Sequence, residues 1–192
     1  MSLTSNQKNK IEEELIKIFK DVCFNNKNIL AAKDESDHVS EEIRKFILSY
    51  AASDENVSEV ELFIKAKEKG LELVEDHDLI FFDETIEGTL KMRAFLIPGM
   101  KVEITEENAA EEVTEDDLQA VDHELCVSFK TNGNNEFVKL GNLIDIRAKL
   151  AKPLGEKTIE DTEVSKVIKQ NKIFEQCLDL VLESASKLLS SQ

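Results

Sequence analysis

Residues 79–104, which read LIFFDETIEGTLKMRAFLIPGMKVEI, decide the fold. The stretch opens with an apolar run, breaks at two acids, and then alternates between two sets of side chains over residues 89–97. A period of two sends successive side chains to opposite faces of a strand. This pattern therefore predicts β-structure in the middle of the chain. One face carries Leu90, Met92, Ala94 and Leu96, and the other carries Lys91, Arg93, Phe95 and Ile97.

Two glycine-containing pairs, Glu87-Gly88 and Pro98-Gly99, divide this stretch into three segments. Glycine tolerates a positive φ, and proline fixes φ near the value that a turn needs. We therefore expect a three-stranded antiparallel meander with a turn at each pair and helices packed largely against its more apolar face. Residues 131–135, TNGNN, predict a further hairpin between strands at 125–130 and 137–140.

Three amphipathic helices are predicted before the strands. The first begins at a capping box formed by Thr4 and Gln7, whose spacing allows each to satisfy a backbone donor of the other. A polar linker at residues 33–37 precedes a second helix capped by Ser40, and a third helix spans residues 56–70. The first apolar stripe consists of Ile11, Leu15, Ile18, Phe19 and Val22.

Two more helices are predicted after the hairpin. A short one starts at Gly141-Asn142 and is stopped by Pro153, because proline cannot continue a helix easily. After a polar connection, the three-four spacing of apolar residues runs from residue 164 to residue 189 and predicts one continuous helix of about seven turns. A helix of this length has enough apolar surface to cover the sheet or to reach another subunit.

Together these elements predict an α+β fold, in which an antiparallel meander plus hairpin sheet is covered by N- and C-terminal amphipathic helices. We expect residues 1–70 to form a helical segment packed on the same core. Residues 71–192 would form the α+β sheet domain with the long C-terminal helix.

Acidic residues outnumber basic ones by 40 to 24, which gives the chain a net charge of −16. Such a surface repels phosphate backbones and anionic lipids, so we expect neither nucleic acid nor a membrane as a partner. No apolar run reaches the ~20 residues of a spanning helix, and no signal-peptide pattern is visible. We therefore expect a cytoplasmic protein, whose three widely spaced cysteines stay reduced and mostly buried.

Familiar motifs of catalysis are missing from the sequence. It contains no glycine-rich phosphate loop, GxSxG elbow, CxxC pair or HExxH motif. We therefore predict no catalytic, cofactor-binding or metal-binding residues, and no cofactor. An enzyme built on carboxylates with His77 or His123 stays open as an alternative. A winged-helix-like regulator over residues 40–97 is a further alternative, although its second helix mixes lysines with glutamates.

The most biased segment, residues 102–129, contains ten acids and neither lysine nor arginine. It is either a solvated acidic loop or a docking site for a basic peptide. Exposed parts of the final helix are a second candidate for contact with a partner. The predicted protein-binding residues are Glu106, Glu107, Glu111, Glu112, Glu115, Asp116 and Asp117 in the acidic segment, and Leu182, Leu188 and Leu189 in the helix.

In the order of its elements and in its acidity, the chain is similar to bacterial secretion chaperones, which are small, acidic, α+β and often dimeric. The resemblance implies a role in binding other proteins. Our leading hypothesis is a non-catalytic cytoplasmic protein-binding module, of an adaptor or chaperone-like kind. Its partner would be a protein, basic if the acidic segment is the docking site, and the sequence also allows a homodimer.

Overall fold

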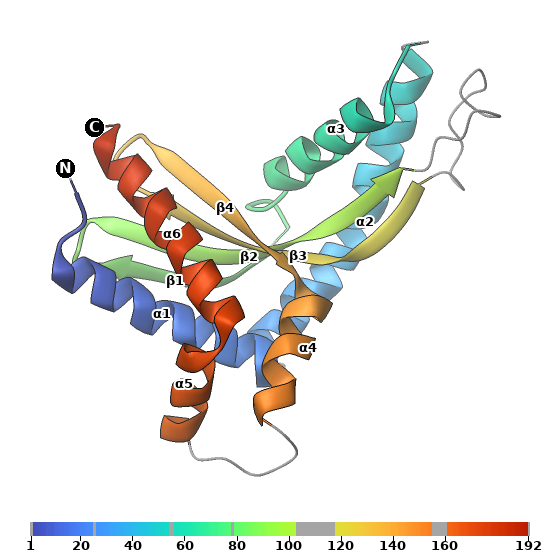
Figure 1. Cartoon of the computed structure of the whole chain (residues 1–192). Helices are drawn as coiled ribbons and strands as arrows, with labels where there is room; N and C mark the ends of the chain where they lie inside the picture. Colours follow the sequence, from blue (N-terminus) through green and yellow to red (C-terminus); the bar gives the residue numbers. More distant parts are fainter. Residues whose placement is uncertain are drawn as a thin grey trace.

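The computed structural model describes residues 2–24, 26–53, 56–77, 79–102, 118–154 and 161–191. Its four strands form one antiparallel sheet in the order β1-β2-β3-β4 (Figure 1). Three helices precede the strands and three follow them, so the α+β prediction is confirmed. The elements are α1 (Ser5–Phe24), α2 (Lys27–Ser53), α3 (Glu59–Glu72), β1 (Ile80–Ile86), β2 (Leu90–Val102), β3 (Leu118–Lys130), β4 (Asn135–Asn142), α4 (Leu143–Leu154), α5 (Asp161–Gln170) and α6 (Lys172–Ser190).

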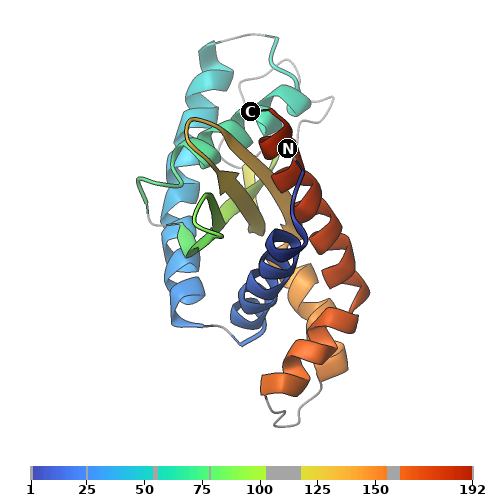
Figure 2. The ribbon, with the colours of Figure 1, turned by 90° about the vertical axis from the view of Figure 1, so that its left-hand side faces the viewer.

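Helices cover both faces of the sheet, whereas the sequence led us to expect packing largely against one. Figure 2 shows α2 on one side of the strands and α1 and α6 on the other. Met92 and Leu96 of β2 belong to a first core with α1, α4, α5 and α6. Phe95 and Ile97 of the same strand belong to a second core with α2 and α3. The expectation was wrong because the second set of β2 side chains is also buried and also needs a cover.

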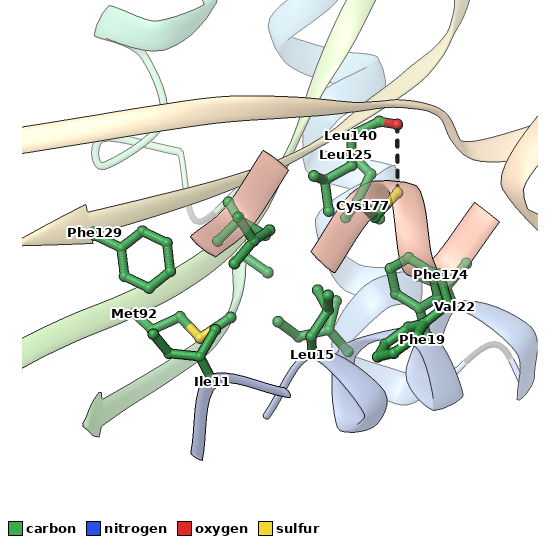
Figure 3. Close-up of a cluster of buried hydrophobic side chains, with 14 of the residues drawn as sticks. Ile11, Leu15, Phe19, Val22, Met92, Leu125, Phe129, Leu140, Phe174 and Cys177 are labelled. Atoms are coloured by element: carbon green, nitrogen blue, oxygen red, sulfur yellow. Dashed lines mark hydrogen bonds between the residues drawn. The ribbon is translucent and has the colours of Figure 1, made fainter. Parts of the chain in front are cut away.

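The first core is the larger one and contains the predicted stripe of α1 (Figure 3). The rings of Phe19 and Phe174 meet edge to face, with their centroids 5.4 Å apart, where α1 passes α6. The thiol of Cys177 on α6 donates a 3.8 Å hydrogen bond to the carbonyl of Leu140 on β4. The capping box is also confirmed: the Thr4 amide donates to the Gln7 side chain, and the Gln7 amide to the Thr4 hydroxyl.

Pro98-Gly99 is not a turn, so that prediction was wrong. β2 runs straight through the pair to Val102 and stays paired with β3, with a register shift between Pro98 and Gly99. Proline has no amide to give to the ladder, and an irregularity of this kind lets a strand accommodate it. The other two turns are confirmed. Glu87 and Gly88 both have positive φ between β1 and β2. A bond from the Thr131 amide to the Asn134 carbonyl closes the β3–β4 hairpin.

The predicted linker at residues 33–37 and the cap at Ser40 both lie inside α2. Ser40 donates a hydrogen bond from its hydroxyl to the Asp37 carbonyl instead of capping a helix. Ser36 and Ser40 occupy buried positions on the inner face of α2. Because they are polar, they interrupt the apolar pattern by which a helix is predicted from sequence. The helix begins in the first core at Ile29 and reaches the second core further along.

α3 differs from its prediction at both ends. Ser58, and not Asn56, caps it by accepting a hydrogen bond from the Glu61 amide. Gly70 does not stop the helix, which continues to Glu72. Gly70 is instead buried inside the helix, where an added Cβ would lie at ordinary contact distance, 3.5 Å from Ile43.

The long C-terminal helix is interrupted, so the prediction of one continuous helix was wrong. Asn171 caps α6 by accepting a hydrogen bond from the Ile173 amide, and its side-chain amide donates to the Lys149 carbonyl of α4. This break lets α5 pack against α1 and α4 while α6 lies along β4 and β3. The predicted start of α4 is confirmed, since Asn142 accepts from the Ile144 amide, and the helix ends one residue after Pro153.

We predict that Gly70→Ala stabilises the protein by about 0.5–1 kcal/mol, because alanine favours the helix and its methyl fits at ordinary contact distance. Urea denaturation measures the change in the free energy of unfolding. Gly141→Ala is the matched control, since Gly141 has a φ of +134° that strains any L side chain. It should destabilise the fold by about 1 kcal/mol or more. A destabilised Gly70→Ala variant would show that the packing around Gly70 has no room for a methyl group.

Candidate protein-binding surface

The predicted protein-binding residues fall into two groups in the structure. The acids from Glu106 to Asp117 lie outside the described residues. On α6, Leu188 and Leu189 are buried in the first core, and Leu182 packs against that core from a partly buried position. These three leucines therefore help to hold one chain together. The described apolar side chain that α6 presents to solvent is Leu180, which is 41% exposed.

α3 carries an exposed apolar row that the sequence analysis did not identify as a surface. Val60, Phe63 and Ile64 are 69%, 36% and 49% exposed. Residues three and four apart adjoin on a helix, so the three side chains form one patch, here called the α3 patch. Leu62 and Ala66 on the other side of the helix are buried in the second core. The signal was present in the sequence, because α3 has more apolar residues than one buried stripe requires.

A groove lies beside α3 on the same side of the sheet. α3 packs on β2, and α2 packs mainly on β1 and β2, so the β3–β4 half of this face is less covered. Arg93, Ser128 and Phe137 are register neighbours across β2, β3 and β4 and line the groove together. Its volume is about 450 Å³, and Leu71 and Phe95 contribute apolar walls. Phe137 is 39% exposed there, which is high for a phenylalanine in a sheet.

Two basic clusters flank this surface. At one end, the ammonium groups of Lys67 and Lys139 lie 3.9 and 3.5 Å from the carboxylate of Glu124. Burial lowers the pKa of Lys139, and the neighbouring Lys67 lowers it further. Two cations thus converge on one carboxylate beside the sheet.

The second cluster lines the groove itself and contains more acidic groups. Arg93 and Lys130 approach the carboxylate of Glu75 at 2.8 and 3.6 Å. The hydrogen bond from Arg93 lowers the pKa of Glu75, and Lys130 lowers it further. Arg93 also pairs with Asp83 at 3.3 Å. Glu72 and Asp76 line the groove as well, so the surface is close to neutral within a strongly acidic chain.

The lysines of α3 are engaged with neighbours inside the protein. Lys67 lies 4.0 Å from the centre of the Phe63 ring, a cation–π contact. Lys65 lies over Tyr50 and pairs with Glu68. Lys69 likewise lies over Phe46 and pairs with Glu72. The winged-helix alternative needs these lysines as a basic face for DNA, and their contacts weaken it.

The two histidines of the enzyme alternative have different acidic partners. His77 lies 3.2 Å from Glu42, whereas His123 lies 3.4 Å from Asp37 and 2.8 Å from the Ser36 hydroxyl. Ser36 is fully buried, so a substrate has no access to its hydroxyl. Within the described ranges, no group of three or more His, Cys, Asp or Glu side chains is arranged to hold a metal ion.

No protein-family model matches this sequence, and comparisons with curated proteins and with solved structures gave no significant match. None of the helices in the described part of the chain has the length and apolar composition needed to cross a membrane.

The cysteines are free thiols, with Cys126 and Cys177 buried and Cys23 partly buried. Burial raises the pKa of Cys23 and of Cys177 to about 11, and that of Cys126 to about 12. At pH 8 a thiol with a pKa of about 11 is ionised in roughly one molecule in a thousand.

We therefore predict that Ellman's reagent reacts with the folded protein at pH 8 at least about a hundredfold more slowly than with the urea-unfolded chain. The unfolded chain should release three equivalents, which serves as the control. A single fast equivalent in the folded protein would instead identify a reactive cysteine and revive the enzyme alternative.

Proposed function

We propose that this chain is a non-catalytic protein-binding module of the adaptor or chaperone-like kind, and that it acts in the cytoplasm. The observation that supports the proposal most directly is the α3 patch, an apolar row left in solvent on a helix whose other exposed side chains are charged. Contiguous apolar side chains rimmed by polar ones commonly mark interaction surfaces. Burying one isoleucine or valine completely contributes roughly 1.5–3 kcal/mol, so even a small patch can anchor a partner.

The patch is not needed for the fold. Leu62 and Ala66 already supply the buried side of α3, and the helix has its own cap at Ser58. Polar residues at positions 60 and 64 would therefore serve an isolated chain equally well, whereas Phe63 also holds Lys67 over its ring. Their apolar character is best explained by a partner that covers them.

The proposed binding role of the α3 patch can be tested with a photo-crosslinking amino acid at position 64 of the tagged full-length chain. The chain is expressed in the organism from which it comes. The expected result is a discrete crosslinked protein species, identified by mass spectrometry and absent when Val60→Glu is added. The matched control places the same crosslinker at position 180, where Leu180 is similarly exposed on α6. Equal crosslinking from both positions, or none from position 64, would count against the proposal.

The acidic segment is the second surface that we propose, on the basis of its composition alone. Replacing its seven predicted acids by their amides removes seven negative charges without changing side-chain size. If the segment docks a basic partner, the partner's affinity should fall by about tenfold or more at 0.15 M salt, and the loss should shrink at higher salt. An unchanged affinity would leave the segment as a solvated connection between β2 and β3.

A further inference from the structure

We propose that the groove beside α3 receives an amphipathic helix from another protein, and that acidic side chains flank the apolar stripe of this helix. The inference rests on the proposed protein-binding function and specifies the chemistry of the partner. It follows from three properties of the surface: its dimensions, the placement of its apolar groups and the arrangement of its cations.

The dimensions favour a helix. Packed helices lie about 8–10 Å apart, and neighbouring strands are separated by about 4.8 Å. α3 packs over β2. A second helix placed beside it at ordinary spacing would therefore lie over the strand two positions away, which is β4. On the opposite face of the sheet, α6 already occupies the place over β4 and β3. A docked helix would complete the less covered face in the same way.

The apolar groups are distributed over two directions, as a helix requires. Leu71 of α3 and Phe137 of β4 line the groove, and Phe63 and Ile64 are exposed further along α3. Side chains of a helical stripe spread over an arc of about 100°, so one helix can contact a wall and a floor together. An added β-strand directs its side chains to two opposite faces, so it could not contact the wall and the floor of the groove together.

The cations of the surface favour acidic residues beside the apolar stripe of the docked helix. Lys67 and Lys139 share the single carboxylate of Glu124, and burial already disfavours the charge of Lys139. An incoming carboxylate would give the two lysines a second acid to pair with, whereas an incoming lysine would add a third cation to the cluster. In the other cluster, Arg93 and Lys130 pair with Glu75, and Arg93 also pairs with Asp83, so these cations already have enough acidic partners. Acids on the flank of the helix can therefore form pairs at the cluster of Lys67 and Lys139.

A second copy of this chain is a poorer occupant. Each copy carries a net charge of −16, so self-association brings two strongly acidic surfaces together. The three residues of the α3 patch are also few for a dimer interface, which commonly buries about 800 Å² on each partner. A single helix from another protein does not need an interface of that size.

The test uses two synthetic helical peptides of 18 residues with the same leucine stripe, one flanked by glutamates and the other by lysines. Fluorescence anisotropy at 0.15 M salt measures binding of each to the full-length protein. We expect the glutamate peptide to bind about tenfold or more tightly than the lysine peptide. Amide chemical shifts should change at Ile64, Phe137 and Lys139.

Charge reversal supplies the specificity control. The double variant Lys67→Glu, Lys139→Glu should invert the preference between the peptides. The variant Lys166→Glu, Lys172→Glu makes the same charge change at exposed positions on α5 and α6 and should leave it unaltered. Circular dichroism of each variant checks that the fold is retained.

Each contrary result overturns the inference. Such results are tighter binding of the lysine peptide, equal binding of both, no binding of either, or chemical-shift changes away from the groove. Sedimentation showing a dimer that Ile64→Glu dissociates would assign the groove to a second copy. If position 64 still crosslinks a partner while the peptides show no acidic preference, the proposed function stands and only the partner chemistry fails.

Discussion

The whole structure depends on β2 having to exclude water from both of its faces. Met92 and Leu96 point into one core, while Phe95 and Ile97 point into the other, and all four are almost completely buried. A strand of this kind cannot lie at the surface of a two-layer protein. It requires helices on both sides, and this requirement divides the N-terminal helices between the two faces. α1 joins the C-terminal helices, whereas most of α2, together with α3, covers the opposite face.

The two helical layers cover their faces of the sheet to different extents, and this difference determines where the candidate surface lies. α1, α4 and α6 pack on one face, with α5 packed against these helices, but α2 and α3 lie chiefly over β1 and β2 on the other. The less covered β3–β4 half has to tolerate water, which explains why Lys130, Lys139 and Glu124 appear there in place of further apolar residues. The groove is therefore a consequence of how the chain distributes its helices. Its mixed character, with phenylalanine beside paired charges, suits a contact that forms and dissociates in water.

The parts of the fold that could be predicted depend on local signals. The stripe of α1, its capping box and the 131–134 turn each involve residues close in sequence, and the structure contains all three. Features that depend on distant residues were missed. The irregularity at Pro98 exists only because β3 continues alongside it, and Asn171 breaks the final helix through a bond to a carbonyl of α4.

Residue type does not indicate burial correctly in two further places. Ser36 and Ser40 lie at core positions of α2, where small hydroxyl side chains fit against neighbours that no local pattern reveals. In α3 the reverse holds, since Val60 and Ile64 are apolar yet lie in solvent. Periodicity predicted a helix in this segment, but it could not identify which of two apolar sides faces the sheet. The surplus of apolar residues in α3 was visible in the sequence, but the groove beside it was not, because it depends on where α3 stops covering the strands.

β2 is shared between two cores of different size, and this difference determines which helical layer separates from the sheet first. The smaller layer of α2 and α3 is held by fewer buried side chains, so it is the layer that should detach first under native conditions. Its release leaves α1, α6 and the sheet assembled, with Phe95 and Ile97 uncovered. Such a partly opened form exposes an apolar sheet surface that can associate with other molecules. A helix seated beside α3 would brace that layer, and the same event would both recruit a partner and suppress aggregation.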